Sequence, residues 1–175
     1  SADAFFKKCD EKNLRMIAGK VMMDRNCPAD LRDSAETSYR ESKSLIERWH
    51  NKERLRYAIT PRFAATSSPA QLDKVRQLMQ EYPDTYLHTH LSEDKDEISL
   101  VNKLFPQCKS YLDVYDQFEL LGQRSIFAHC IHLEAEEWHR LSQTRSNIAF
   151  CPSSNLFLGN GLFSLKTAEE QDINV

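Results

Sequence analysis

Histidine and glutamate residues that follow apolar runs are the features of this sequence that could carry chemistry. His90 and Glu93 form a His-x-x-Glu pair where the apolar run 85–90 gives way to an acidic loop. His129 holds an equivalent place at the end of the run 125–130. Imidazole binds divalent metals and a carboxylate can carry a proton, so this set indicates metal-assisted hydrolysis.

A purely structural interpretation of these residues stays open. The segment 92–94 is also a plausible helix start, in which Glu93 would only cap a helix. A histidine such as His129, followed by Cys130, is more often packed than ligating. His88 shares a strand face with His90, because side chains alternate along a strand. It could be a second ligand, although we favour a histidine in the interior of a barrel.

Two polar clusters follow other predicted strands. In the first, Pro61 ends a strand and is followed by Arg62 and Phe63. A guanidinium beside an aromatic ring suits a planar heterocycle that carries a carbonyl acceptor. A salt-bridged arginine and a packed phenylalanine explain the cluster equally well. The second cluster, 151–155, is polar but could be merely a turn.

The elements that would position these residues alternate between strand and helix. Apolar runs predict strands at 14–23, 54–60, 85–90, 125–130 and 146–150, with 173–175 as a strand cut short. Helical spacing predicts helices at 31–49, 94–105, 111–121, 134–144 and 162–171, and one more that Ser68 and Pro69 open.

This alternation implies a parallel sheet with right-handed crossovers, in an α/β fold. A doubly wound sheet and a (β/α) barrel both satisfy the order. We favour the barrel, because polar residues recur at the C-terminal ends of successive strands, which a barrel gathers at one mouth. About five to six of the eight βα units are present, and a complete barrel needs about 250 residues. We therefore expect residues 1–175 to be the central segment of a larger metal-dependent hydrolase barrel.

Composition excludes several functional classes. The chain is 41% hydrophobic and carries a net charge of -3 without a basic face, so neither nucleic acid nor a membrane surface is an expected partner. No long apolar run or signal peptide is present, which predicts a cytoplasmic protein. The four glycines are too scattered for a phosphate-binding loop. Five cysteines without framework spacing predict reduced thiols.

The ordered motifs together resemble the guanine deaminases of the amidohydrolase superfamily. They lie at 60–63, 88–93, 127–129 and 150–156, with further likeness at 21–26 and 111–115. The resemblance implies hydrolysis of guanine to xanthine and ammonia at one divalent metal, usually zinc, with iron also suited. His90 and His129 would be metal ligands, and Glu93 would move protons. Arg62 and Phe63 would bind the purine.

The resemblance also implies groups that this sequence lacks. The family has a His-x-His pair on its first barrel strand and an aspartate after its last strand, and neither is present. His88 and His90 match a later motif of the family, which supplies a single ligand. We therefore expect the isolated segment to be weakly active or inactive, and the full-length enzyme to be a homodimer that acts on guanine. Two alternatives stay open: an amidohydrolase that acts on another aminated heterocycle, such as a pterin or a triazine, and a non-catalytic barrel-derived segment.

Overall fold

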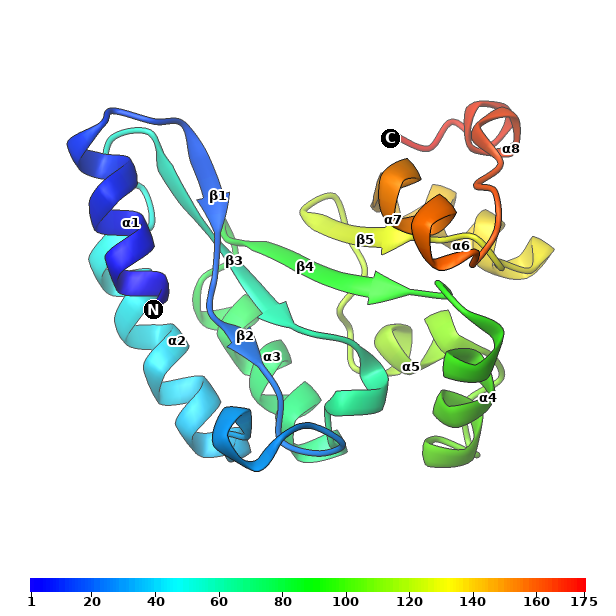
Figure 1. Ribbon diagram of the computed structural model, residues 1–175, viewed down its shortest axis with the longest axis horizontal. Coiled ribbons are helices and arrows are strands. Elements are labelled where there is room, and N and C mark those ends of the chain that lie inside the picture. Colours follow the sequence, from blue (N-terminus) through cyan, green and yellow to red (C-terminus); the bar gives the residue numbers. More distant parts are fainter. The chain divides into compact units, whose positions relative to one another are not determined.

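The computed structural model describes all residues from 1 to 175, and its helices and strands alternate along the chain (Figure 1). The strands are β1 Met16–Ala18, β2 Val21–Met22, β3 Leu55–Pro61, β4 Tyr86–Leu91, β5 Ser125–His129 and β6 Asn147–Ala149. The helices are α1 Ala2–Glu11, α2 Ala35–Trp49, α3 Pro69–Glu81, α4 Lys95–Leu104, α5 Tyr111–Gln117, α6 Ala135–Thr144, α7 Pro152–Leu158 and α8 Leu165–Glu170. Short 3-10 turns cover Ala29–Leu31 and Ala64–Thr66.

The chain divides into two compact units. The first contains Ser1–Arg62 and Thr66–His88, and the second contains Phe63–Ala65 and Thr89–Val175. In the first unit β3 pairs in parallel with β1, β2 and β4. In the second unit β5 pairs in parallel with β6. The strand order β1-β3-β4-β5-β6 and the helices between the strands agree with the predicted parallel sheet.

The predicted strand at 14–23 is divided into β1 and β2 at Gly19. A Cβ atom at Gly19 would lie 1.7 Å from the carbonyl oxygen of Ala58 on β3, so only glycine permits this close approach. The backbone N–H of Lys20 donates to the Tyr57 hydroxyl at 3.1 Å, outside the ladder. Close contacts with β3 therefore divide a segment that the sequence pattern predicts as one strand.

An aromatic stack forms part of the first unit's core and explains a helix that the sequence did not predict. Helix α1 buries Phe6, whose ring stacks on Trp49 and on Tyr57, each with centroids 5.9 Å apart. The His50 side chain, at the end of α2, is only 5% exposed. Its Nδ1 accepts the Tyr57 N–H at 3.0 Å, which ties the end of α2 to β3.

The C-terminal part of the chain differs most from the sequence predictions. The run 151–155 opens helix α7 and is not merely a turn, since Pro152 occupies the first helical turn, where its missing N–H costs nothing. The predicted helix 162–171 is shortened to α8. Residues 173–175 form no strand, although Ile148 on β6 donates its N–H to the carbonyl of Asn174 at 2.9 Å.

A half-buried acid, Glu97, connects helices α4 and α5 of the second unit. The Tyr111 hydroxyl on α5 donates a hydrogen bond to Glu97 on α4. Burial raises the pKa of Glu97 from 4.5 to about 7, and the charges of Glu93 and Asp94 add to the rise, while the Tyr111 bond opposes it. Glu97 is thus a group whose proton is held more tightly in the folded state than in the unfolded state.

This pKa shift predicts a pH-dependent effect of Glu97→Gln on stability. Below pH 4.5 Glu97 is protonated in both states, and as the pH rises toward 7 only the unfolded state loses its proton, so the wild type loses stability. Glutamine is neutral and retains an oxygen for Tyr111. The variant should therefore gain in unfolding temperature over the wild type between these limits, as measured by calorimetry. Asp96→Asn, at an exposed carboxylate on the same helix, should show no such gain.

Candidate functional site

The ends of β4 and β5 turn sharply and are hydrogen-bonded to one another. Three non-glycine residues there have positive φ: Ser92 at 48°, His129 at 74° and Cys130 at 51°. Such conformations cost free energy unless the surroundings fix them. The N–H of Cys130 donates to the Leu91 carbonyl at 2.9 Å, and the N–H of Ile131 donates to the Ser92 carbonyl at 3.1 Å. These bonds hold the two turns side by side.

Four of the predicted site residues come together at these strand ends. The rings of His90 and His129 are stacked, with centroids 5.3 Å apart and planes at 18°. The Phe63 ring lies edge-on to His90 at 6.2 Å. Oε2 of Glu93 lies 3.3 Å from Nε2 of His129, and the two side chains are 18% and 6% exposed. One carboxylate and two imidazoles thus share a largely desolvated place.

Two asparagines that the sequence analysis did not assign to the site complete the polar contacts. Oδ1 of Asn155, on α7, lies 2.7 Å from Nδ1 of His129. Nδ2 of Asn160 donates to Oε1 of Glu93 at 3.0 Å. The only signal in the sequence is weak: Asn155 belongs to the polar run 151–155, and Asn160 lies between two glycines.

The Asn155 contact determines the tautomer of His129. An amide oxygen only accepts, so Nδ1 carries the proton, and in neutral imidazole Nε2 then offers a lone pair. That lone pair faces Oε2 of Glu93, which is also an acceptor. Two acceptors at this distance need a proton or a cation near both of them. The arrangement therefore suits proton transfer or metal binding.

Glu93 is not a helix cap, which removes the structural alternative for this residue. The side chain of Asp94 caps α4, accepting from the N–H groups of Asp96 at 2.8 Å and Glu97 at 3.2 Å. The Glu93 carboxylate points instead toward His129 and Asn160. The cap lies one residue further along the chain than a Glu93 cap would require.

Arg62 belongs to the first unit and directly follows β3. Its backbone N–H donates to the Met22 carbonyl at 3.1 Å, and its Nη1 lies 3.8 Å from the sulfur of Met23. The β2 segment thus fixes the place where the arginine leaves the sheet, and the side chain is exposed. His88 is also exposed in this unit, and its expected place in the interior of a complete barrel stays a prediction.

A metal ion is held by several side chains grouped around it as ligands. No group of three or more histidine, cysteine, aspartate and glutamate side chains is arranged to hold a metal ion. His90 and His129 remain as the predicted pair of imidazoles. The cysteines are all free, and burial raises the pKa of the Cys130 thiol well above its ordinary value, so it stays protonated.

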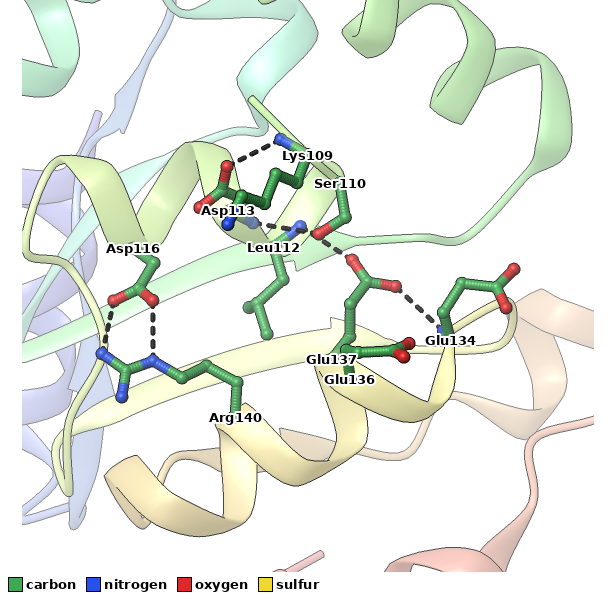
Figure 2. Close-up of a pocket in the computed structure, with 9 residues that line it drawn as sticks. All are labelled: Lys109, Ser110, Leu112, Asp113, Asp116, Glu134, Glu136, Glu137 and Arg140. Atoms are coloured by element: carbon green, nitrogen blue, oxygen red, sulfur yellow. Dashed lines mark hydrogen bonds and ion pairs between the residues drawn. The ribbon is translucent and has the colours of Figure 1, made fainter. Parts of the chain in front are cut away.

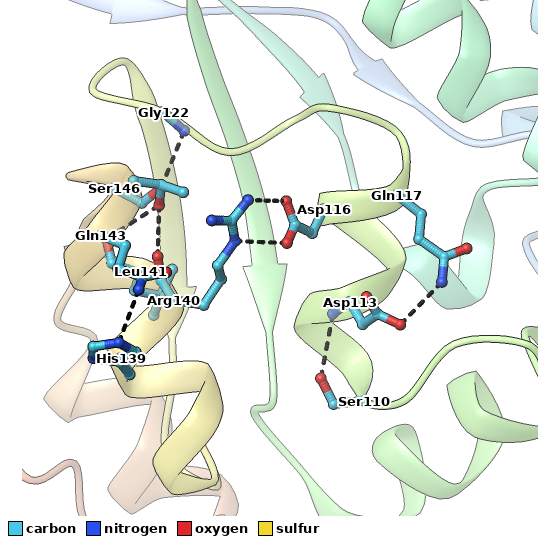
Figure 3. Close-up of polar contacts among 11 residues, drawn as sticks. Ser110, Asp113, Asp116, Gln117, Gly122, His139, Arg140, Leu141, Gln143 and Ser146 are labelled. Carbon is cyan, nitrogen blue, oxygen red and sulfur yellow. Dashed lines mark hydrogen bonds and ion pairs between the residues drawn. The ribbon is translucent and has the colours of Figure 1, made fainter.

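A cavity of about 340 Å³ lies between α5 and α6, away from the predicted site residues (Figure 2). Two of its acidic side chains, those of Glu137 and Asp116, have structural partners. Glu137 accepts the N–H groups of Leu112 at 2.9 Å and Glu134 at 3.0 Å. Arg140 on α6 donates two bonds to Asp116 on α5, at 2.6 and 2.8 Å (Figure 3). These contacts join the two helices, and the cavity carries no comparable chemistry.

No helix is both long and apolar enough to cross a membrane.

The chain is similar in sequence and in fold to known guanine deaminases. The chain is 59% identical to guanine deaminase of Escherichia coli (strain K12), covering 100% of this chain and 40% of the relative. The solved structure of the E. coli enzyme superimposes with a TM-score of 0.97, covering 98% of this chain and 40% of that chain. For guanine deaminase from C. acetobutylicum with bound guanine, the identity is 33% and the TM-score is 0.94, over 98% of this chain and 41% of that one.

A more distant structure extends the likeness of the fold. Atrazine chlorohydrolase TrzN from Arthrobacter aurescens, solved with zinc, is 19% identical and gives a TM-score of 0.90, over 98% of this chain and 39% of that chain. Together with the guanine deaminases it confirms the predicted fold class, part of a (β/α) barrel. This chain spans about 40% of the length of the relative in E. coli.

The sequence also matches the amidohydrolase family over residues 1–175. The match includes the strand ends that group His90, Glu93 and His129. Because it covers the whole sequence, the chain belongs to the amidohydrolase family.

Proposed function

We propose that the enzyme containing this chain hydrolyses guanine to xanthine and ammonia, and that residues 1–175 form the central part of its barrel domain. The observation that carries the proposal is the Glu93 carboxylate facing Nε2 of His129, beside the His90 ring. The similarity to guanine deaminases, one of them solved with guanine bound, supports the substrate.

We propose one divalent metal as the cofactor, with zinc preferred over iron. His90 and His129 would be two of its ligands, because imidazole nitrogen suits both metals. The remaining ligands would come from other parts of the parent enzyme. When bound, the metal supplies Lewis acidity that lowers the pKa of a coordinated water toward about 7. The facing acceptors of His129 and Glu93 fit a cation at this place.

Glu93 is proposed to move protons during the reaction. Asn160 holds Oε1, so the carboxylate has a fixed orientation and Oε2 faces the reacting groups. Oε2 would take one proton from the attacking water as the C–O bond forms at the amino-bearing carbon, and would pass it to the ring nitrogen whose double bond to that carbon opens. It would then take the second proton from the same oxygen and deliver it to the leaving nitrogen as the C–N bond breaks. The products are the carbonyl of xanthine and ammonia, so atoms and charge balance.

Arg62 and Phe63 are proposed to bind the purine. A guanidinium that follows β3 can donate two hydrogen bonds, one to the purine carbonyl oxygen and one to the ring nitrogen N7. The Phe63 ring, edge-on to His90, would border the same heterocycle. A cytoplasmic location, expected because the sequence shows no long apolar run or signal peptide, stays a prediction. A homodimeric full-length enzyme, expected from the family resemblance, also stays a prediction.

The proton-transfer role predicts the result of Glu93→Gln in the full-length enzyme. Glutamine can keep an oxygen toward Asn160 but cannot accept and release a proton, so kcat should fall by about 100-fold to 10,000-fold. The metal content, measured by elemental analysis, should be unchanged. Glu136→Gln, at an exposed position on α6, should keep wild-type turnover. Near-normal turnover by the Glu93 variant would remove this residue from the mechanism.

The proposed pair of hydrogen bonds from the Arg62 guanidinium to the purine predicts that Arg62→Lys weakens the binding of guanine. Lysine keeps the charge but loses bidentate geometry, so KM for guanine should rise about tenfold while the protein stays folded. Arg40→Lys, at an exposed position on α2, is the matched control. A panel of guanine, a pterin and ammeline tests the alternative substrates. Faster turnover of either of the last two than of guanine would overturn the assignment of substrate.

The proposed cofactor separates an enzyme from a non-catalytic member of the fold. Purified full-length protein should contain about one zinc or iron per subunit, and dialysis against a chelator should abolish turnover until metal is restored. Elemental analysis and ammonia release measure the two effects. Metal-free protein that still deaminates guanine would contradict the metal role, whereas metal-free protein without any activity would favour the non-catalytic alternative.

A further inference from the structure

Tyr115 on α5 makes three polar contacts with segments that carry the candidate site. Its side chain is fully buried, and all of its partners lie in the second unit. The hydroxyl donates to the carbonyl oxygen of His90 at 2.8 Å and accepts the N–H of Ala64 at 2.9 Å. Its third partner is the hydroxyl of Thr89, at 3.1 Å.

The direction of these bonds follows from the number of hydrogens. A phenol has one proton, and the carbonyl of His90 can only accept it. Thr89 must therefore donate to the Tyr115 oxygen, as the N–H of Ala64 does. Burial raises the pKa of Tyr115, so the phenol keeps the proton that His90 requires. All three bonds are compatible with one another in this single protonation state.

The three partners belong to the two segments that carry proposed functions. Thr89 and His90 lie on β4, and His90 is the proposed metal ligand. Ala64 directly follows Phe63, which is proposed to border the purine. Phe63 and His90 also contact each other through their rings. One hydroxyl thus joins the backbone behind the ligand to the backbone behind the substrate-binding ring.

Rigid packing behind Tyr115 makes it a suitable anchor. Its ring contacts Phe127 on β5 at 5.6 Å between centroids, and Tyr111, one turn earlier on α5, at 5.7 Å. All three of these residues are buried. A hydroxyl held by such packing can fix the position of a neighbouring strand end to a fraction of an ångström.

We propose that Tyr115 is a positioning residue, whose hydroxyl sets the register of Phe63 against His90 and so aligns substrate with the metal-binding strand. The role rests on the proposed function. Tyr115 itself does not contact the reacting groups. It acts through the backbone of His90 and Ala64, which distinguishes it from Glu93.

Tyr115→Phe in the full-length, metal-loaded enzyme tests this role. The ring and its packing remain while the hydroxyl is lost, so kcat/KM for guanine should fall by about tenfold to 100-fold. Hydrogen exchange at the Ala64 amide should become faster, and a chelator should remove the metal sooner. Tyr57→Phe is the matched control, because it deletes an equally buried hydroxyl in the first unit, where it accepts the N–H of Lys20.

A second pair of variants covers the case in which Tyr115→Phe does not fold. Thr89→Val removes the hydroxyl that donates to Tyr115, and Thr89→Ser restores it. The valine variant should show the same losses in smaller measure, and the serine variant should recover kcat/KM to near the wild-type value.

Different results of these experiments would contradict the positioning role of Tyr115 and the proposed function of the enzyme. Equal effects of the Tyr115 and Tyr57 variants on kcat/KM and on Ala64 exchange would overturn the positioning role, as would a serine variant no better than valine. If the wild-type enzyme did not turn over guanine, the proposed function would be contradicted instead. In that case Ala64 exchange and metal retention still decide whether Tyr115 holds the two segments.

Discussion

The hydrogen bonds between the ends of β4 and β5 are the constraint on which the candidate site depends. They run from Cys130 to Leu91 and from Ile131 to Ser92, just where both backbones enter the left-handed region. Parallel strands bring their C-terminal ends to the same edge of a sheet, but that alone leaves the directions of the side chains open. The paired turns direct His129 toward Glu93. Without these hydrogen bonds, nothing would offset the free energy that each positive φ costs.

The asparagines convert this proximity into defined chemistry. Asn155 assigns the proton of His129 to Nδ1, and Asn160 occupies one oxygen of Glu93. What remains is one lone pair and one carboxylate oxygen facing each other in a place that water hardly enters. Low local polarity strengthens such interactions and makes an unfilled pair of acceptors costly. The same arrangement therefore favours both a bound cation and a mobile proton.

Sequence patterns predicted those elements whose signals are local. Ser68 caps α3 and Pro69 begins it, as expected, because a cap and its helix lie within one turn. The apolar runs that became β3, β4 and β5 were placed to within a residue or two at their ends. Prediction failed for elements whose position or ends depend on contacts between residues far apart in the sequence. Helix α1 is packed through Phe6 against Trp49 and Tyr57, and the break at Gly19 depends on Ala58.

The sequence by itself determined the residue types, their order along the chain and the alternation of strand and helix, and through these the family. Tertiary structure alone decided the partners. Asn155 is 26 residues from His129, Asn160 is 67 from Glu93, and Tyr115 is 51 from Ala64. No periodicity links positions so far apart, because their contact depends on how β4, β5 and the following helices pack. A strand-end histidine can be read from a pattern, whereas the direction of its proton depends on the folded chain.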